Sequence, residues 1–190
     1  MHRFHQFLLI ASVLALAWLG MQAVHELGHC LGAWATGGTV KQVVLHPLTI
    51  SRTDVAPNPW PLIVVWMGPV FGVLLPVFVW GVFIAFRSPF AWLPRFFAGF
   101  CLIANGIYIG VGSFEGIGDA GDIVRYGSPV WVLWLFGLAT VPAGLSLWNG
   151  LGPHFGLGTS APPIDRRVAY GCLAVLLATI VVECLLSPAF

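Results

Sequence analysis

The segment from Phe7 to Gly38 reads FLLIASVLALAWLGMQAVHELGHCLGAWATGG. Apolar residues dominate it as far as Trp34, which exceeds the length of about 20 residues that crosses a bilayer as a helix. Gly37 and Gly38 follow, and glycine commonly ends helices by adopting left-handed backbone geometry. We therefore expect a membrane-spanning helix over residues 7–34, with a histidine-rich motif near its end.

The whole chain has the composition of an integral membrane protein. Of its 190 residues, 58% are hydrophobic and 8% are charged, against about 25% charged in ordinary soluble domains. The net charge is +1 without a basic run, which argues against a nucleic-acid partner. The four cysteines lie in apolar segments without a C-x-x-C pair, so we expect small core residues rather than metal ligands or disulfides.

Five apolar segments are long enough to cross a bilayer. They cover roughly residues 7–34, 61–86, 92–112, 129–150 and 168–187. We expect an all-α polytopic membrane protein with about five transmembrane helices (four to six), forming a single membrane-embedded domain over residues 1–190. Gly68-Pro69 and Pro76 leave a kinked or re-entrant second segment as an alternative. Residues 1–20 resemble a signal peptide, but the apolar pattern continues to Trp34, which favours a retained helix.

The segment after the first helix has a different character. It reads TVKQVVLHPLTISRTDV from Thr39 to Val55 and is rich in β-branched residues. Between Leu48 and Thr53, larger side chains alternate with Thr or Ser. This period of two is typical of strands, so we expect a short β-hairpin here.

His25, Glu26 and His29 form an H-E-x-x-H motif, HELGH, inside the first helix. Residues four apart share one helical face, so both histidines can bind one zinc ion through neutral imidazole nitrogens. Glu26 lies about 100° around the helix from His25, where it can activate a zinc-bound water. Ionisable groups in a spanning helix are costly without a function. The motif therefore predicts a catalytic zinc site.

The motif lacks a third ligand, which catalytic zinc usually has. The segment FEGIGDAGDIVRYG, between the third and fourth spans, contains Glu115, Asp119 and Asp122. With five spans it lies on the same side of the membrane as the end of the first helix, and the motif lies about 27 Å along that helix, near the same face. Asp119 and Asp122 are one helical turn apart, so either can be the third ligand. Glu115 is the third choice.

These residues resemble the site-2 protease family of intramembrane zinc metalloproteases, as a divergent, minimal member. HELGH, at residues 25–29, is similar to the family's first motif, and the β-like loop and Gly68-Pro69 also look similar. The segment from Asp119 to Arg125 occupies the place of the second motif, whose aspartate supplies the third zinc ligand. The family's asparagine and proline just upstream of that aspartate are absent, since Asn105 is distant from it.

The resemblance implies a zinc-dependent intramembrane endopeptidase that hydrolyses peptide bonds of membrane-protein substrates. It implies His25 and His29 as ligands of one Zn²⁺ ion, with Asp119 or Asp122 as the third ligand. Glu26 is then the general base. The expected partners are a transmembrane or membrane-anchored protein substrate and the lipid bilayer, with no nucleic acid. The expected location is the cell membrane, as a multi-pass protein.

Two other functions stay open. A non-catalytic membrane scaffold or regulator that retains the metal site is compatible with the missing asparagine and proline. An iron-binding membrane redox protein usually has several histidine pairs on separate helices, whereas the remaining histidines, His2, His5, His46 and His154, are scattered. Orientation also stays open. The arginine and lysine distribution places the HELGH end outside, whereas the family resemblance implies a site nearer the cytoplasmic face.

Overall fold

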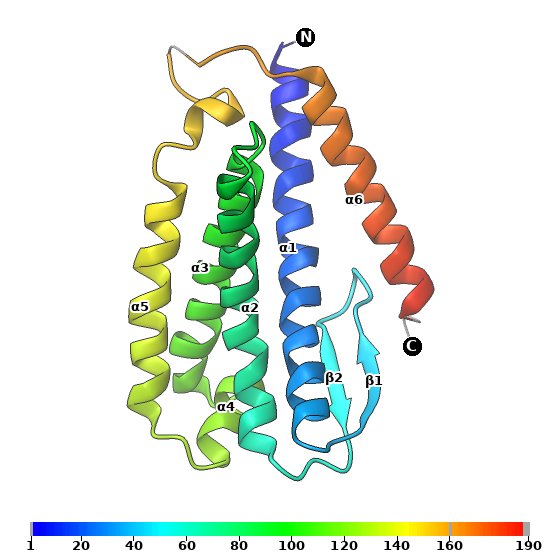
Figure 1. The fold of residues 1–190 in the computed structure, drawn as a ribbon, viewed down its shortest axis with the longest axis vertical. Coiled ribbons are helices and arrows are strands. Elements are labelled where there is room, and N and C mark those ends of the chain that lie inside the picture. Colours follow the sequence, from blue (N-terminus) through cyan, green and yellow to red (C-terminus); the bar gives the residue numbers. More distant parts are fainter. Residues whose placement is uncertain (1, 160, 188–190) are drawn as a thin grey trace.

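The computed structural model describes residues 2–159 and 161–187 as a helical bundle with one small sheet (Figure 1). The elements in chain order are α1 (His2–Ala35), β1 (Val40–Val44), β2 (Arg52–Val55), α2 (Pro61–Ala85), α3 (Trp92–Glu115), α4 (Gly118–Arg125), α5 (Val130–Trp148), the 3₁₀ helix η1 (Gly152–Phe155) and α6 (Arg166–Leu186). Among the described residues, five helices are long and apolar enough to cross a membrane: α1, α2, α3, α5 and α6. The predicted all-α polytopic fold with a hairpin after its first helix is confirmed.

The two ends of the bundle differ in what covers them. α1 packs against α2 and α6, while α3 packs against α2 and α5. Figure 1 shows α4 and both strands at the end of the bundle where α1 ends, and the amino terminus and the start of α6 at the opposite end. We call these the hairpin end and the amino-terminal end of the bundle.

α1 ends where the glycine pair predicts. Gly37 has a φ of +76°, and the Gly38 N–H donates to the carbonyl of Ala33 at 2.7 Å. A residue with a Cβ is strained at that φ, so glycine reverses the chain here at low cost. The reversal sends the hairpin back alongside the end of α1, which brings β2 into contact with that helix.

The hairpin lies where the sequence predicts it, but its second strand is shorter than the alternating segment. β1 and β2 pair antiparallel. The residues from Leu48 to Ser51 belong to the connection, because the Thr49 N–H donates to the carbonyl of His46 and closes a turn. Leu48 and Ile50 are 88% and 89% exposed. The alternation at 48–51 therefore marks an exposed tip rather than a strand.

α2 is one continuous helix rather than a re-entrant element. Pro69 and Pro76 lie inside it and are buried. Each proline removes one helical hydrogen bond, a loss that neighbouring helices make tolerable in membranes. Small residues on α1 allow the two helices to approach closely. A Cβ at Gly28 would collide with the Met67 carbonyl, and one at Gly32 would lie 2.9 Å from the Met67 Cβ.

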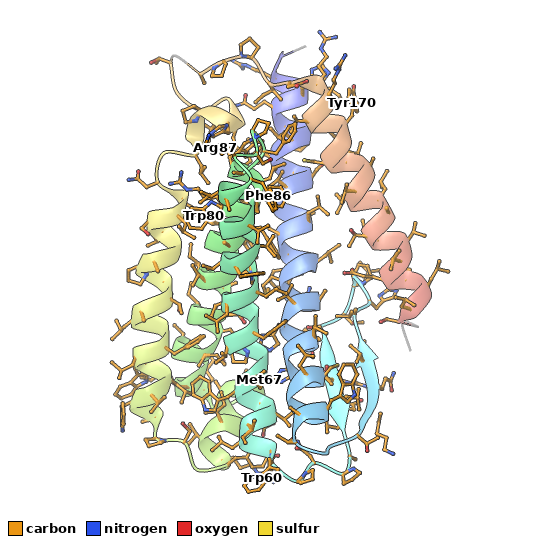
Figure 2. All side chains as sticks on the ribbon, in the orientation of Figure 1. Trp60, Met67, Trp80, Phe86, Arg87 and Tyr170 are labelled. Carbon is orange, nitrogen blue, oxygen red and sulfur yellow. The ribbon has the colours of Figure 1, made fainter. Side chains whose placement is uncertain are left out.

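Apolar and aromatic side chains cover much of the outer surface (Figure 2). Trp60 lies at the hairpin end and is 60% exposed, while Tyr170, at the opposite end, is 50% exposed. Trp and Tyr side chains near both ends of spanning helices are typical of membrane–water interfaces. Together with the five long apolar helices, this surface indicates a membrane protein.

The cysteines are free, as the sequence predicts. Cys30, Cys101 and Cys172 are buried. The prediction of a core position is wrong for Cys184, which is exposed. The reason is that α6 packs on the bundle through one face only, and most residues of its last turns are exposed.

Candidate metal centre

Three ligand atoms converge at the hairpin end of the bundle. The Oδ2 atom of Asp119 lies 2.6 Å from the Nε2 atom of His25 and 3.2 Å from the Nε2 atom of His29. The two Nε2 atoms are 3.0 Å apart. In the part of the chain that the structure describes, these residues are the one group of three or more His, Cys, Asp or Glu side chains that could hold a metal ion.

The structure separates the three acids that the sequence left as candidates for the third ligand. Asp119 joins the histidines. Asp122 lines the same cavity but does not belong to the group of converging ligand atoms. Glu115 is exposed at the last position of α3.

Core packing of α4 determines which aspartate faces the histidines. Ala120 and Ile123 are fully buried in a cluster that includes Ile109 of α3 and Leu133 of α5. These contacts fix one face of the short helix against the bundle. Asp119 lies one turn before Ile123, at the edge of this buried face, so the same packing turns it toward the interior of the bundle, whereas Asp122 lies further round the helix.

Hydrogen bonds to the Nδ1 atoms fix the tautomers of both histidines. His29 Nδ1 donates to the carbonyl of Val64 at 2.8 Å. His25 Nδ1 lies 2.8 Å from Oδ1 of Asn105. The Asn105 amide is itself oriented, because its Nδ2 donates to the carbonyl of Cys101 at 2.9 Å, which leaves Oδ1 as the acceptor. Both Nε2 atoms therefore present lone pairs when the rings are neutral.

The donor set suits a metal ion. With both neutral imidazoles donating from Nδ1, two nitrogen lone pairs and a carboxylate oxygen face one another at 2.6 to 3.2 Å. Such an arrangement is repulsive unless a positive charge lies between the atoms, and a metal ion or a proton supplies it. Two imidazoles and one carboxylate are common ligands of catalytic zinc, and hydrogen bonds on the distal ring nitrogens are typical of such sites.

Asp119 is held in its charged form. Burial raises the pKa of this carboxyl, but its contacts with the Nε2 atoms of His25 and His29, which become hydrogen bonds when a ring carries the bridging proton, outweigh burial and hold the pKa well below its usual range. The backbone N–H of Asp119 also donates to the Tyr108 hydroxyl at 3.0 Å. The Tyr108 ring in turn lies edge-on to His25, with centroids 5.9 Å apart. Through Tyr108, α3 therefore contacts two of the three candidate ligands.

Glu26 is buried beside the histidines and is held by the hairpin. Ser51 Oγ donates to one carboxylate oxygen and Thr53 Oγ1 donates to the other, both at 2.7 Å. The residue is only 3% exposed. A carboxylate has about four lone-pair sites, so these two hydrogen bonds leave others available.

A cavity of about 920 Å³ contains these groups. Its walls come from α1, β2, the start of α2, α3 and α4, and the three ligands and Glu26 all line it. The volume lies within the range of about 300–1,000 Å³ that is typical of ligand pockets. The cavity therefore has room for a molecule larger than water beside the candidate centre.

Two glycines of α2 make room for the centre. A Cβ at Gly68 would collide with the His29 ring and would lie 2.9 Å from Nε2 of His25. One turn later, a Cβ at Gly72 would lie 2.9 Å from Oδ1 of Asn105. In the Gly68-Pro69 pair, Gly68 therefore matters because its lack of a side chain leaves space for the two histidine rings.

Sequence reasoning missed the residues that support the ligands and the base. Asn105 is too distant from Asp119 in the sequence to fit the second motif, and its contact is instead with His25. The available signal was its position three residues before Tyr108, which places both polar side chains near one face of an apolar helix. Ser51 and Thr53 lay in the predicted hairpin, but their role depends on how that hairpin folds back on α1.

Comparison with known proteins gives no match to a protein-family model, to a curated protein or to a solved structure. The resemblance to the site-2 protease family therefore stays a prediction from the motif. Functional inference depends on the chemistry of the residues that line the cavity.

Proposed function

We propose that this protein is a zinc-dependent intramembrane endopeptidase of the cell membrane, as its resemblance to site-2 proteases implies. The observation that carries the proposal is the convergence of His25, His29 and Asp119, with Glu26 in the same cavity. Zinc hydrolases use these side-chain types as ligands and base. A bound zinc ion would polarise a scissile carbonyl and lower the pKa of water toward about 7.

Glu26 is the general base in this proposal. Its carboxylate would accept a proton from the attacking water and return it to the leaving amine. Ser51 and Thr53 support that role because they hold both carboxylate oxygens in place. Asn105 supports zinc binding rather than the base, since its hydrogen bond to Nδ1 keeps the Nε2 atom of His25 available as a ligand.

The substrate in this proposal is a transmembrane or membrane-anchored protein that reaches the centre as an extended chain. A helical segment has its backbone amides occupied, so it must unwind before an amide can be cleaved. All four residues of β2 line the cavity, and β1 pairs with only one edge of β2. The other edge of β2 can therefore hydrogen-bond to an unwound segment as an added strand.

The test is Glu26→Gln in the native cell, with candidate membrane substrates followed by electrophoresis and metal measured in the purified protein. Glutamine keeps the size of the side chain but cannot act as the base. We expect cleavage to fall by about 100-fold or more, the usual contribution of a general base, with zinc retained. Glu115→Gln is the matched control, because Glu115 is exposed and outside the cavity, and it should change neither quantity.

Each other outcome points to a different function. Unchanged cleavage in Glu26→Gln would reject the proposed role of Glu26 and the protease with it. Zinc binding without cleavage of any membrane substrate by the unmodified protein would favour the scaffold or regulator. Iron in place of zinc would favour the redox protein.

A further inference from the structure

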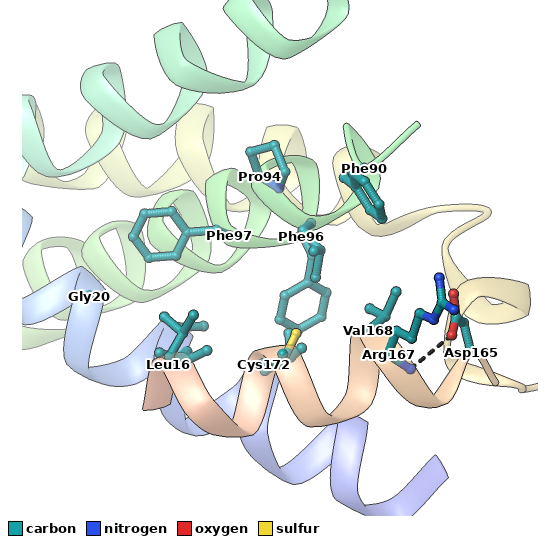
Figure 3. A pocket seen from close by; sticks show the side chains of 15 residues that line it. Leu16, Gly20, Phe90, Pro94, Phe96, Phe97, Asp165, Arg167, Val168 and Cys172 are labelled. Carbon is teal, nitrogen blue, oxygen red and sulfur yellow. Dashed lines mark hydrogen bonds between the residues drawn. The ribbon is translucent and has the colours of Figure 1, made fainter. Parts of the chain in front are cut away.

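A second cavity lies between α1, α3 and α6 at the amino-terminal end of the bundle (Figure 3). Its volume is about 690 Å³, again within the range of about 300–1,000 Å³ that is typical of ligand pockets. Its lining is apolar apart from Asp165 and Arg167. None of the residues of the candidate metal centre lines it, so the two cavities are separate.

This second cavity has a charged end and a deep apolar end. α1, α3 and α6 run in the same direction (Figure 1), and Figure 3 shows Asp165 and Arg167 at one end and Gly20 at the other. At the deep end the Phe97 ring lies against α1, since a Cβ at Gly20 would be 3.2 Å from the ring. The lining residues of α1, from Val13 to Gly20, cover about 10 Å along the helix axis.

The amino-terminal end of the bundle, where the charged end of this cavity lies, is rich in arginine. Arg166 and Arg167 begin α6, Arg3 lies in the first turn of α1, and Arg87 lies between α2 and α3 at the same end (Figure 2). Asp165 precedes Arg166 and is the one acid that lines the cavity. Its carboxylate caps α6 by accepting the Arg167 backbone N–H at 2.8 Å, and the Arg167 side chain is exposed. The arginine side chains thus outnumber the single carboxylate.

We propose that this cavity binds an anionic phospholipid. An acyl chain would lie between α3 and α6, and the headgroup phosphate would contact Arg166 and Arg167. A slot that is apolar along its length, with Arg167 in its lining and Arg166 next to it in the chain, matches an amphiphile with a negative headgroup, and arginine suits phosphate through paired hydrogen bonds. A spanning helix of another protein fits less well, because it is about 30 Å long and the slot covers about a third of that length.

The first test fills the slot and measures lipid binding by native mass spectrometry of the full-length protein in detergent. Phosphatidylglycerol and phosphatidylcholine with identical acyl chains are the probes. Gly171→Leu is the filling variant, because Gly171 lines the cavity and a Cβ there meets no atom within 4 Å, so the leucine can begin without backbone crowding. Gly81→Leu is the matched control, because Gly81 is an equally open glycine on α2 outside both cavities.

We expect Gly171→Leu to weaken phosphatidylglycerol binding about tenfold, as the loss of a few buried CH₂ contacts predicts. Gly81→Leu should leave the affinity unchanged. Similar affinities for the two variants would overturn the proposal, whichever lipid is used.

The second test concerns the headgroup. We expect Arg167→Gln to reduce the preference for phosphatidylglycerol over phosphatidylcholine about fivefold, because one arginine near an anionic surface contributes on that scale. Arg125→Gln, at the hairpin end, is the control and should leave the preference unchanged. An unmodified protein that binds both lipids equally would overturn the proposed anionic specificity, even if Gly171→Leu weakens both.

Discussion

Both cavities are lined by α1 and α3, over different parts of these helices, but the two linings differ in chemistry. At the hairpin end, His25, Glu26, His29 and Asp119 each contact a hydrogen-bond partner from another element. At the amino-terminal end, the same two helices present an almost wholly apolar surface. The difference shows how one spanning helix can line an apolar cavity over one stretch, from Val13 to Gly20, and bury three ionisable side chains of a polar cavity further along.

The contrast has a physical consequence for substitutions. Each polar group at the hairpin end depends on partners in fixed positions, because an unpaired polar group is costly where water is scarce. Apolar contacts at the amino-terminal end have no such directional requirement. Equivalent changes should therefore have larger effects at the hairpin end.

The largest expected effect comes from removing Asp119, the proposed third ligand. Asp119→Asn should lower zinc affinity by more than about 100-fold, because losing a ligand exceeds the 10- to 100-fold loss that is typical of an outer-shell residue. Asp122→Asn is the matched control and should keep the affinity of the unmodified protein. The measurement is zinc retained against a chelator of known affinity. Equal retention by the two variants would contradict the assignment of Asp119.

A smaller but still large effect is expected for Gly68→Ala. The added Cβ collides with the His29 ring, and crowding of this kind costs about 1–3 kcal/mol. Gly81→Ala, in the same helix but with open space around the Cβ, should instead stabilise the protein by up to about 1 kcal/mol. Thermal unfolding in detergent and zinc content report both results. A neutral Gly68→Ala would show that the rings of the centre are free to move.

The fold could be predicted from the sequence because the bilayer imposes a length. The predicted spans agree with the observed helices, and the two histidines of HELGH lie together because helical period fixes them. The choice between Asp119 and Asp122 could not be predicted in this way. Both lie on α4, and the choice depends on the burial of Ala120 and Ile123, which is a property of the assembled bundle.

The supporting residues were harder to predict for the same reason. Asn105 lies 80 residues from His25 in the chain, and no local pattern joins them. The prediction for the hairpin tip was wrong for another reason. Alternation at Leu48 and Ile50 predicted a strand, but these residues lie in an exposed connection. Periodicity describes one element at a time, whereas the centre forms between elements.

An effect of intermediate size is expected at Asn105, which lies in the polar cavity at the hairpin end but is not a proposed zinc ligand. Asn105→Leu keeps a side chain of similar size but removes the acceptor for the Nδ1 atom of His25, so zinc affinity should fall about 10- to 100-fold. Asn105→Asp keeps an acceptor and should retain most of the affinity. The chelator competition used for Asp119 measures both. If Asn105→Leu bound zinc like the unmodified protein, the hydrogen bond to His25 would have no role in holding the ligand.

The smallest effect is expected for Gly20→Ala, the counterpart of Gly68→Ala at the amino-terminal end. The new Cβ would lie 3.2 Å from the Phe97 ring, and that ring lines a cavity into which it can shift. The gain in helix propensity, about 1 kcal/mol, should offset the remaining crowding. Phe97 can move because nothing in the slot requires its orientation, whereas the His29 ring is tied to the Val64 carbonyl. The contrast fails if Gly20→Ala and Gly68→Ala lose equal thermal stability. Steric crowding alone would then explain both losses, and the hydrogen bonds of the candidate metal centre would not explain why the hairpin end tolerates substitution poorly.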